Sequence, residues 1–166
     1  MWRPRVAFGL VLVGLLARPV PTETIVLGFP SIEAALAVER AIDGAGRRLQ
    51  GATCESLFAY FTDSSGRPLS ANLVRVVARA ADYLRLLRFV NGSAAAQCAS
   101  GETLAFTSPH GRVIRVCAGR FTERSRTNPT YVEMIVIHEL LHALGLEENP
   151  PTNQAITATV VARCGG

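Results

Sequence analysis

Two histidines one helical turn apart, with a glutamate beside the first, are the residues of this 166-residue chain best suited to chemistry. His138 and His142 are four positions apart, so on a helix they share one face, with Cβ atoms about 5–6 Å apart. Two imidazoles at that spacing can bind one metal ion. Glu139 projects about 100° round the helix from His138, where it can reach a metal-bound water. We therefore expect a metal site here, the alternative being two histidines satisfied by local hydrogen bonds.

The segment around these residues predicts a buried helix. Asn128 is a suitable N-cap and Pro129 suits the first helical position, where a missing N–H costs nothing. Apolar residues lie on most sides of the helix, and Gly145 is expected to end it. Burying polar side chains without partners costs several kcal/mol. A bound metal ion would remove that cost.

A catalytic zinc ion takes three protein ligands and leaves one position for water, so a third ligand is needed. No acidic residue follows Glu148, so the third ligand is not a carboxylate on a later helix. A turn at Gly145 would bring Glu147 or Glu148 back towards the histidines. His110, the remaining histidine, is expected to lie exposed on a turn, although it is the only other histidine available to the metal or to an oxyanion.

The pattern H-E-x-x-H-x-x-G-x-x-E, which runs from His138 to Glu148, resembles the zincin metallopeptidases and specifically the extended motif of the metzincins. The last position of the motif is Asp in snapalysin-like enzymes and falls here on Glu148, so this register favours Glu148 over Glu147. The chain departs from the metzincins in one respect. They carry a methionine turn beneath the zinc, whereas Met134 precedes the motif and no methionine follows it.

The resemblance implies a zincin-like α+β fold, with a small mixed sheet or hairpin packed on the active-site helix and other helices. It implies one Zn²⁺ ion bound by His138, His142 and Glu148. It also implies a zinc endopeptidase that acts on peptides or proteins, in which Glu139 is the general base that takes a proton from zinc-bound water.

The group that would stabilise the oxyanion is left open among Tyr131, His110, Arg115 and zinc alone. Two other functions are also open. The chain could be a non-catalytic binding or inhibitory domain that derives from a peptidase and is stabilised by zinc, or a structural domain without metal.

The amino end predicts a secretory signal peptide over about residues 1–20, because basic residues precede an apolar run over 6–17. The run is shorter than the roughly 18–20 residues of a membrane span, although an uncleaved anchor is an alternative. We expect a mature start between 18 and 24, one domain over 24–166, a secreted or periplasmic location and no stable membrane span after cleavage. Without Arg3, Arg5 and Arg18 the chain has 14 basic and 13 acidic residues, which gives no basis for binding nucleic acid.

Four cysteines in an exported chain predict two disulfides. Three pairings are open, and we favour Cys54 with Cys98 and Cys117 with Cys164. Zinc binding by these thiols is disfavoured because no two form a C-x-x-C pair.

The remaining elements follow from caps and periodicity. Residues 24–30 are either a first strand or the tail of the signal region. We expect a helix capped by Ser31 that ends near Asp43 at Gly44 and Gly46, a loop over 64–68, and a long helix over 70–90 with its arginines exposed. A hairpin is expected over 103–120, with Gly119 and Arg120 leading out, and a last helix from Thr152 to about Arg163. In a peptidase, the second hairpin strand (112–117) would be an open sheet edge for an extended substrate.

Overall fold

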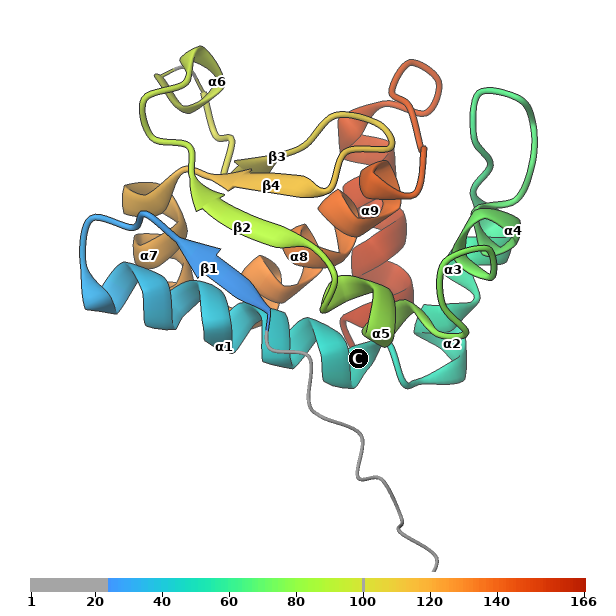
Figure 1. Cartoon of the computed structure of the whole chain (residues 1–166), viewed down its shortest axis with the longest axis horizontal. Coiled ribbons are helices and arrows are strands. Elements are labelled where there is room, and N and C mark those ends of the chain that lie inside the picture. Colours follow the sequence, from blue (N-terminus) through green and yellow to red (C-terminus); the bar gives the residue numbers. More distant parts are fainter. Residues whose placement is uncertain (1–23, 100) are drawn as a thin grey trace, which may run out of the picture.

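The computed structural model describes residues 24–99 and 101–166, and the predicted signal peptide lies outside the described residues. Four short strands form one mixed sheet: β1 (Ile25–Leu27), β2 (Arg88–Asn91), β3 (Ala105–Phe106) and β4 (Val113–Val116). Their order in the sheet is β1-β2-β4-β3. β1, β2 and β4 run parallel, and β3 pairs antiparallel with β4 (Figure 1). The first strand is confirmed, and the α+β class is confirmed.

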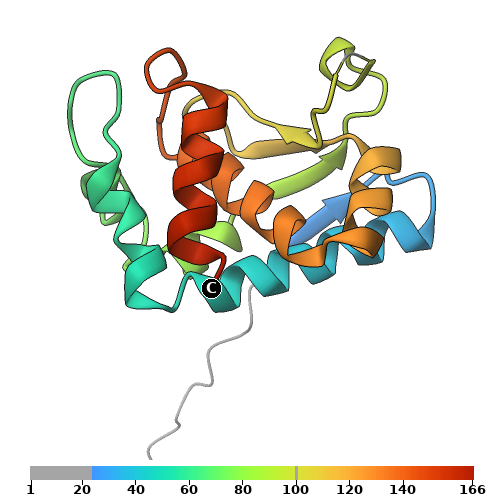
Figure 2. The ribbon, with the colours of Figure 1, turned by 180° about the vertical axis from the view of Figure 1, so that it is seen from behind.

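The helices differ greatly in length. They are α1 (Ile32–Arg48), α2 (Ala52–Glu55), α3 (Leu57–Tyr60), α4 (Leu69–Leu73), α5 (Ala80–Leu84), α6 (Ala96–Ala99), α7 (Ala118–Thr127), α8 (Pro129–Ala143) and α9 (Asn153–Cys164). α8 packs against α1, α7, α9 and β3. Seen from behind, α7, α8 and α9 lie in front of the sheet, so the helix with the two histidines is in the middle of the domain (Figure 2).

Helix α1 begins as predicted and ends later than predicted. The hydroxyl of Ser31 accepts a hydrogen bond from the backbone N–H of Ala34, which is the expected cap. The helix then passes through Gly44 and Gly46 to Arg48. Gly44 has a packing role, because a Cβ atom there would lie 2.1 Å from a carboxylate oxygen of Glu133 on α8. The glycine lets the two helices approach closely and does not end α1.

The long helix predicted over 70–90 is wrong. The segment forms α4, a turn, α5 and then β2, although Arg75, Arg79, Arg85 and Arg88 are exposed as expected. Phe89 is fully buried and pairs with Ile114 of β4 in parallel register. Backbone hydrogen bonds to a strand about 25 residues later therefore override a helical pattern of apolar residues.

The hairpin is confirmed, with Ala105 opposite Val116 and Phe106 opposite Arg115. The expectation that its second strand is an open edge is wrong, because β4 pairs with β2 on one side and β3 on the other. The outer strands of the described sheet are β1 and β3. Gly119 and Arg120 do not lead out in a loop, since both lie in the first turn of α7.

The two disulfides are present, and the favoured pairing is wrong. Cys54 pairs with Cys164, which joins α2 to the last residue of α9. Cys98 pairs with Cys117, which joins α6 to the residue before α7. In the described part of the chain, no helix is long and apolar enough to cross a membrane.

Candidate metal centre

Helix α8 carries both histidines into the core, and local sequence explains how it begins. The side chain of Asn128 accepts a hydrogen bond from the backbone N–H of Tyr131, and Pro129 is the first helical residue, as predicted. His138, Glu139 and His142 are only 2%, 4% and 5% exposed. Among the described residues these three and Asp63 are the buried polar ones. Such residues need partners, because burying an unsatisfied polar group is costly.

The two imidazoles meet at their Nε2 atoms, which lie 2.9 Å apart. The Nδ1 atom of His142 donates a hydrogen bond of 2.7 Å to the carbonyl of Leu146. A carbonyl only accepts, so Nδ1 carries a hydrogen, and in the neutral form of the ring Nε2 presents a lone pair towards His138. Two imidazole nitrogens that converge in this way can share one cation.

The other nitrogen of His138 also has a partner. Its Nδ1 lies 3.0 Å from the hydroxyl of Thr157, which α9 brings over α8. A hydroxyl can accept as well as donate, so it can take the Nδ1 hydrogen and leave Nε2 of His138 free to bind a metal. Burial, with a smaller contribution from His142, lowers the pKa of His138 to about 3. The imidazole is thus neutral at physiological pH, which is the form that binds metal ions.

Glu148 completes a group of three. One of its oxygens lies 3.4 Å from Nε2 of His142 and accepts a hydrogen bond from the side-chain amide of Asn153 at 3.1 Å. One ligand atom from each of His138, His142 and Glu148 lies within 4.8 Å of the others, and this group could hold a metal ion. The Glu148 side chain is 39% exposed, so the group opens to solvent on this side. Glu147 is exposed and is not part of the group.

Glu139 is a buried carboxyl group with one unused oxygen. One of its interactions is with the backbone N–H of Thr107, just after β3. Its Oε2 atom is buried without a hydrogen-bond partner among the described residues. Burial raises the pKa of Glu139 to about 8, the hydrogen bond from Thr107 opposes this shift, and the negative charge of Glu148 adds to it. A carboxyl group in this environment can exchange protons near neutral pH.

The turn after α8 depends on Gly145, as predicted. Its φ of +110° is in the region that favours glycine. The N–H of Gly145 bonds the carbonyl of His142, and the N–H of Leu146 bonds that of Leu141, which is the Schellman arrangement. His110 is exposed on its turn as expected, and its backbone N–H also bonds the carbonyl of His142.

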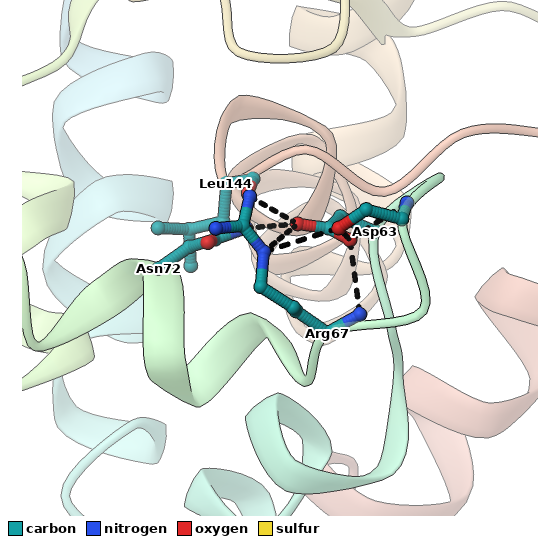
Figure 3. Close-up of polar contacts among 5 residues, drawn as sticks. Asp63, Arg67, Asn72 and Leu144 are labelled. Atoms are coloured by element: carbon teal, nitrogen blue, oxygen red, sulfur yellow. Dashed lines mark hydrogen bonds and ion pairs between the residues drawn. The ribbon is translucent and has the colours of Figure 1, made fainter.

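Sequence reasoning missed the residues that bind the last two carbonyls at this helix end. The hydroxyl of Tyr83 on α5 donates to the carbonyl of Ala143 at 3.1 Å. The amide of Asn72 on α4 donates to the carbonyl of Leu144 and to the buried carboxylate of Asp63, each at 3.0 Å (Figure 3). The polar character of Tyr83 and Asn72 is the one signal in the sequence that could have identified them. Both precede the motif by at least about 55 positions, so no local pattern links them to it.

The candidates for stabilising an oxyanion are separated by the fold. Tyr131 lies in the first turn of α8, with the guanidinium of Arg124 over its ring at 5.4 Å. Arg115 is exposed on β4, between the buried residues Ile114 and Val116, so it points away from the core. The ring of His110 lies beside Gly145, in the turn between the histidines and Glu148.

A cavity of about 520 Å³ lies between β1, α1 and α5, and none of the motif residues lines it. The metal group is therefore a separate site, formed by α8, the turn after it and α9. Comparison with protein-family models, with curated proteins and with solved structures finds no match to this chain.

Proposed function

We propose that this protein is a zinc-dependent peptidase that hydrolyses peptide bonds, with Glu139 as the general base. The observation that carries the proposal is the convergence of two buried imidazoles, 2.9 Å apart at Nε2, beside a buried carboxyl group with an unused oxygen. A structural histidine pair would not require such a carboxyl group next to it. The proposal includes the zincin-like architecture that the motif implies.

The donor set favours zinc. Two imidazole nitrogens and one carboxylate oxygen, from His138, His142 and Glu148, are a common ligand set for catalytic zinc, which keeps one position open for water. Leu146 and Thr157 hold the two Nδ1 atoms, as outer-shell partners of zinc-bound histidines do. When bound, zinc would lower the pKa of its water and polarise the substrate carbonyl.

The surroundings of Glu139 support its role as the group that moves the proton. Its Oε2 atom has no partner among the described residues and is free to accept a proton from an attacking water. The pKa of about 8 belongs to the metal-free protein. A nearby dication would lower it, so the group would be an ionised base at neutral pH and would pass the proton to the leaving amine.

The edge strand beside Glu139 supports a peptide as substrate. β3 pairs with β4 on one side and has no strand on the other within the described sheet. Thr107, the residue after β3, contacts Glu139 through its backbone N–H. An extended peptide that pairs with the free edge of β3 would therefore run past the general base.

Two disulfides support a site of action outside the reducing cytosol, in a secreted or periplasmic protein.

The experiment compares the wild-type protein with Glu139→Gln and, as the matched control, Glu147→Gln, an exposed carboxylate outside the metal group. We expect one zinc per wild-type chain and cleavage of a peptide library that a chelator abolishes. Glu139→Gln should keep the zinc and lose about 10²–10⁴-fold in cleavage rate, the size of a general-base contribution. Glu147→Gln should cleave normally.

Cleavage retained by Glu139→Gln would overturn the assignment of the base. Stoichiometric zinc with an intact peptide library for the wild-type protein would instead favour the second function, a zinc-stabilised binding or inhibitory domain. A wild-type chain without zinc would refute both.

A further inference from the structure

Asp63 is the one buried polar residue, among those described, that the proposed mechanism does not use. Its side chain is only 2% exposed. Hydrogen bonds from Ser65 and Asn72 contribute most to holding its pKa well below the usual range, so it is a buried carboxylate. It lies in the loop between Thr62 and Pro68, which pair as an isolated bridge. A buried charge in a surface loop needs an explanation, because its desolvation is costly.

Most of the contacts of this carboxylate lie within its own loop. Oδ1 accepts hydrogen bonds from the backbone and hydroxyl of Ser65 and from the backbone of Arg67. Oδ2 accepts from the guanidinium of Arg67 and from the amide of Asn72. Asn72 alone lies outside the loop, on α4. It connects the carboxylate to another part of the protein.

The amide of Asn72 joins two acceptors. Its Nδ2 atom is 3.0 Å from Oδ2 of Asp63 and 3.0 Å from the carbonyl oxygen of Leu144, and Figure 3 shows the amide between them. A carboxylate and a carbonyl both only accept, so the NH₂ group must face them. Asp63 and the carbonyl of Leu144 thus fix the same orientation of the amide.

Leu144 is the C-cap of α8, two residues before the carbonyl that orients a metal ligand. The chain turns at Gly145, and the carbonyl of Leu146 then accepts the 2.7 Å hydrogen bond from His142. Glu148 follows two residues later. A change at the Leu144 peptide would therefore move both the carbonyl that holds His142 and the segment that carries Glu148.

We propose that Asn72 and Asp63 are positioning residues of the metal centre, which fix the turn after α8 so that His142 and Glu148 converge. Neither residue touches the metal ligands. The inference rests on the proposed metal site but not on its peptidase activity.

The test uses the full mature chain and compares two variants. Asn72→Leu keeps the volume and removes the donor, and Asp63→Asn replaces a charged group that only accepts by an amide that can also donate. Ser65→Ala is the matched control, because it removes a 2.6 Å hydrogen bond to the same carboxylate without a path to α8. Zinc affinity is measured by competition with a chromogenic chelator. The ligand field is followed by the visible absorption of the Co²⁺-substituted protein, and folding by thermal unfolding of the metal-free form.

We expect Asn72→Leu and Asp63→Asn to weaken zinc binding by about tenfold, the lower end of the range for outer-shell partners, and to change the Co²⁺ absorption. Ser65→Ala should stay within about twofold of the wild type and keep its spectrum. If Asn72→Leu does not fold, Asn72→Ala takes its place.

Wild-type affinity and an unchanged Co²⁺ spectrum in the Asn72 variant would overturn the inference. Equal losses in Ser65→Ala and Asn72→Leu would also overturn it, since they would show a general effect of the loop on stability. A wild-type chain that binds no zinc refutes this inference and the proposed metal site together. Zinc binding without peptide cleavage would refute the proposed peptidase activity but not this inference.

Discussion

The imidazole of His110 lies where a side chain at Gly145 would be. A Cβ atom on Gly145 would be 2.3 Å from Cε1 of His110 and 2.8 Å from its Nε2. The β3–β4 turn is therefore docked on the end of α8 by this ring and by the hydrogen bond from the His110 backbone to the carbonyl of His142. The positive φ of Gly145 favours a glycine there, and any added side chain would also have to displace the ring of His110.

Replacing Gly145 by alanine should destabilise the protein by about 2 kcal/mol or more, because it adds backbone strain to a collision with His110. His110→Ala in the same chain should recover part of that loss by removing the collision. Urea unfolding of the single and double variants measures both effects. The matched control is Gly46→Ala, at a helical glycine with open space around its Cβ position, which should be neutral or slightly stabilising. Full additivity of the two substitutions would contradict the contact.

Removing the hydroxyl of Thr157 should weaken zinc binding without unfolding the protein. Thr157→Val keeps the shape and deletes the partner of Nδ1 of His138, so we expect about a tenfold loss of zinc affinity. Thr159→Val is the control, because that hydroxyl bonds only the carbonyl of Ala155 on its own helix. Chelator competition measures both. Equal affinities for the two variants would show that Thr157 does not orient His138.

The metal-free protein should be most stable between about pH 4.5 and 6.5. His138 is neutral in the folded state with a pKa of about 3, below its ordinary 6.5, so stability is lost as pH falls below 6.5. Glu139 has a folded pKa of about 8, above its ordinary 4.5, so stability is lost as pH rises from 4.5 to about 8. The two effects cancel between about pH 4.5 and 6.5, where both act. The free energy of unfolding is therefore constant in that range and falls on both sides of it.

Glu139→Gln separates these effects. Without the carboxyl group, the alkaline decline should disappear. Between pH 4.5 and 8 the variant should gain about 5 kcal/mol of stability relative to the wild type, because the pKa shift spans that interval and each pKa unit is worth about 1.4 kcal/mol. The acid decline from His138 should remain. Thermal and urea unfolding of chelator-treated protein from pH 3 to 9 give the two profiles. An alkaline decline of equal size in both proteins would assign it to another group.

The two disulfides should contribute unequally to stability. Cys54–Cys164 closes a loop with a sequence separation of 110, and Cys98–Cys117 one of 19. Loop-closure entropy predicts a cost of about 4–5 kcal/mol for removing the first and about 3 kcal/mol for the second. Replacement of each pair by serines, followed by urea unfolding, measures the difference. Peptide mapping of the oxidised protein checks the pairing itself, and a Cys54–Cys98 linkage would contradict the fold.

The parts of the site that follow from the sequence are those whose causes are local. The cap at Asn128, proline at the first helical position and the turn at Gly145 are set by neighbours within a few residues, and α8 has the predicted ends. The i, i+4 spacing places His138 and His142 on one face wherever the helix lies. The third member, Glu148, is brought to the histidines by the same local turn.

Short strands and side-chain partners depend on distant residues, and prediction failed there. The segment 86–90 looks helical by its apolar residues, yet β2 forms because β1 and β4 supply its hydrogen bonds from both sides. The pairing of the cysteines could not be predicted for the same reason, because it depends on residues far apart in the sequence. Cys54 meets Cys164 because α2 packs beside the end of α9, a contact that no spacing encodes.

The sequence by itself determined a buried helix with two histidines, a glutamate and a glycine-dependent turn, since helix geometry converts spacing directly into a shared face. Only the tertiary structure decided which groups complete that site. Thr157, Thr107 and Asn72 reach α8 from three other segments and bind a ring nitrogen, a carboxyl group and a carbonyl. The physical reason is that buried polar groups must find partners, and packing of distant segments determines which partners are near.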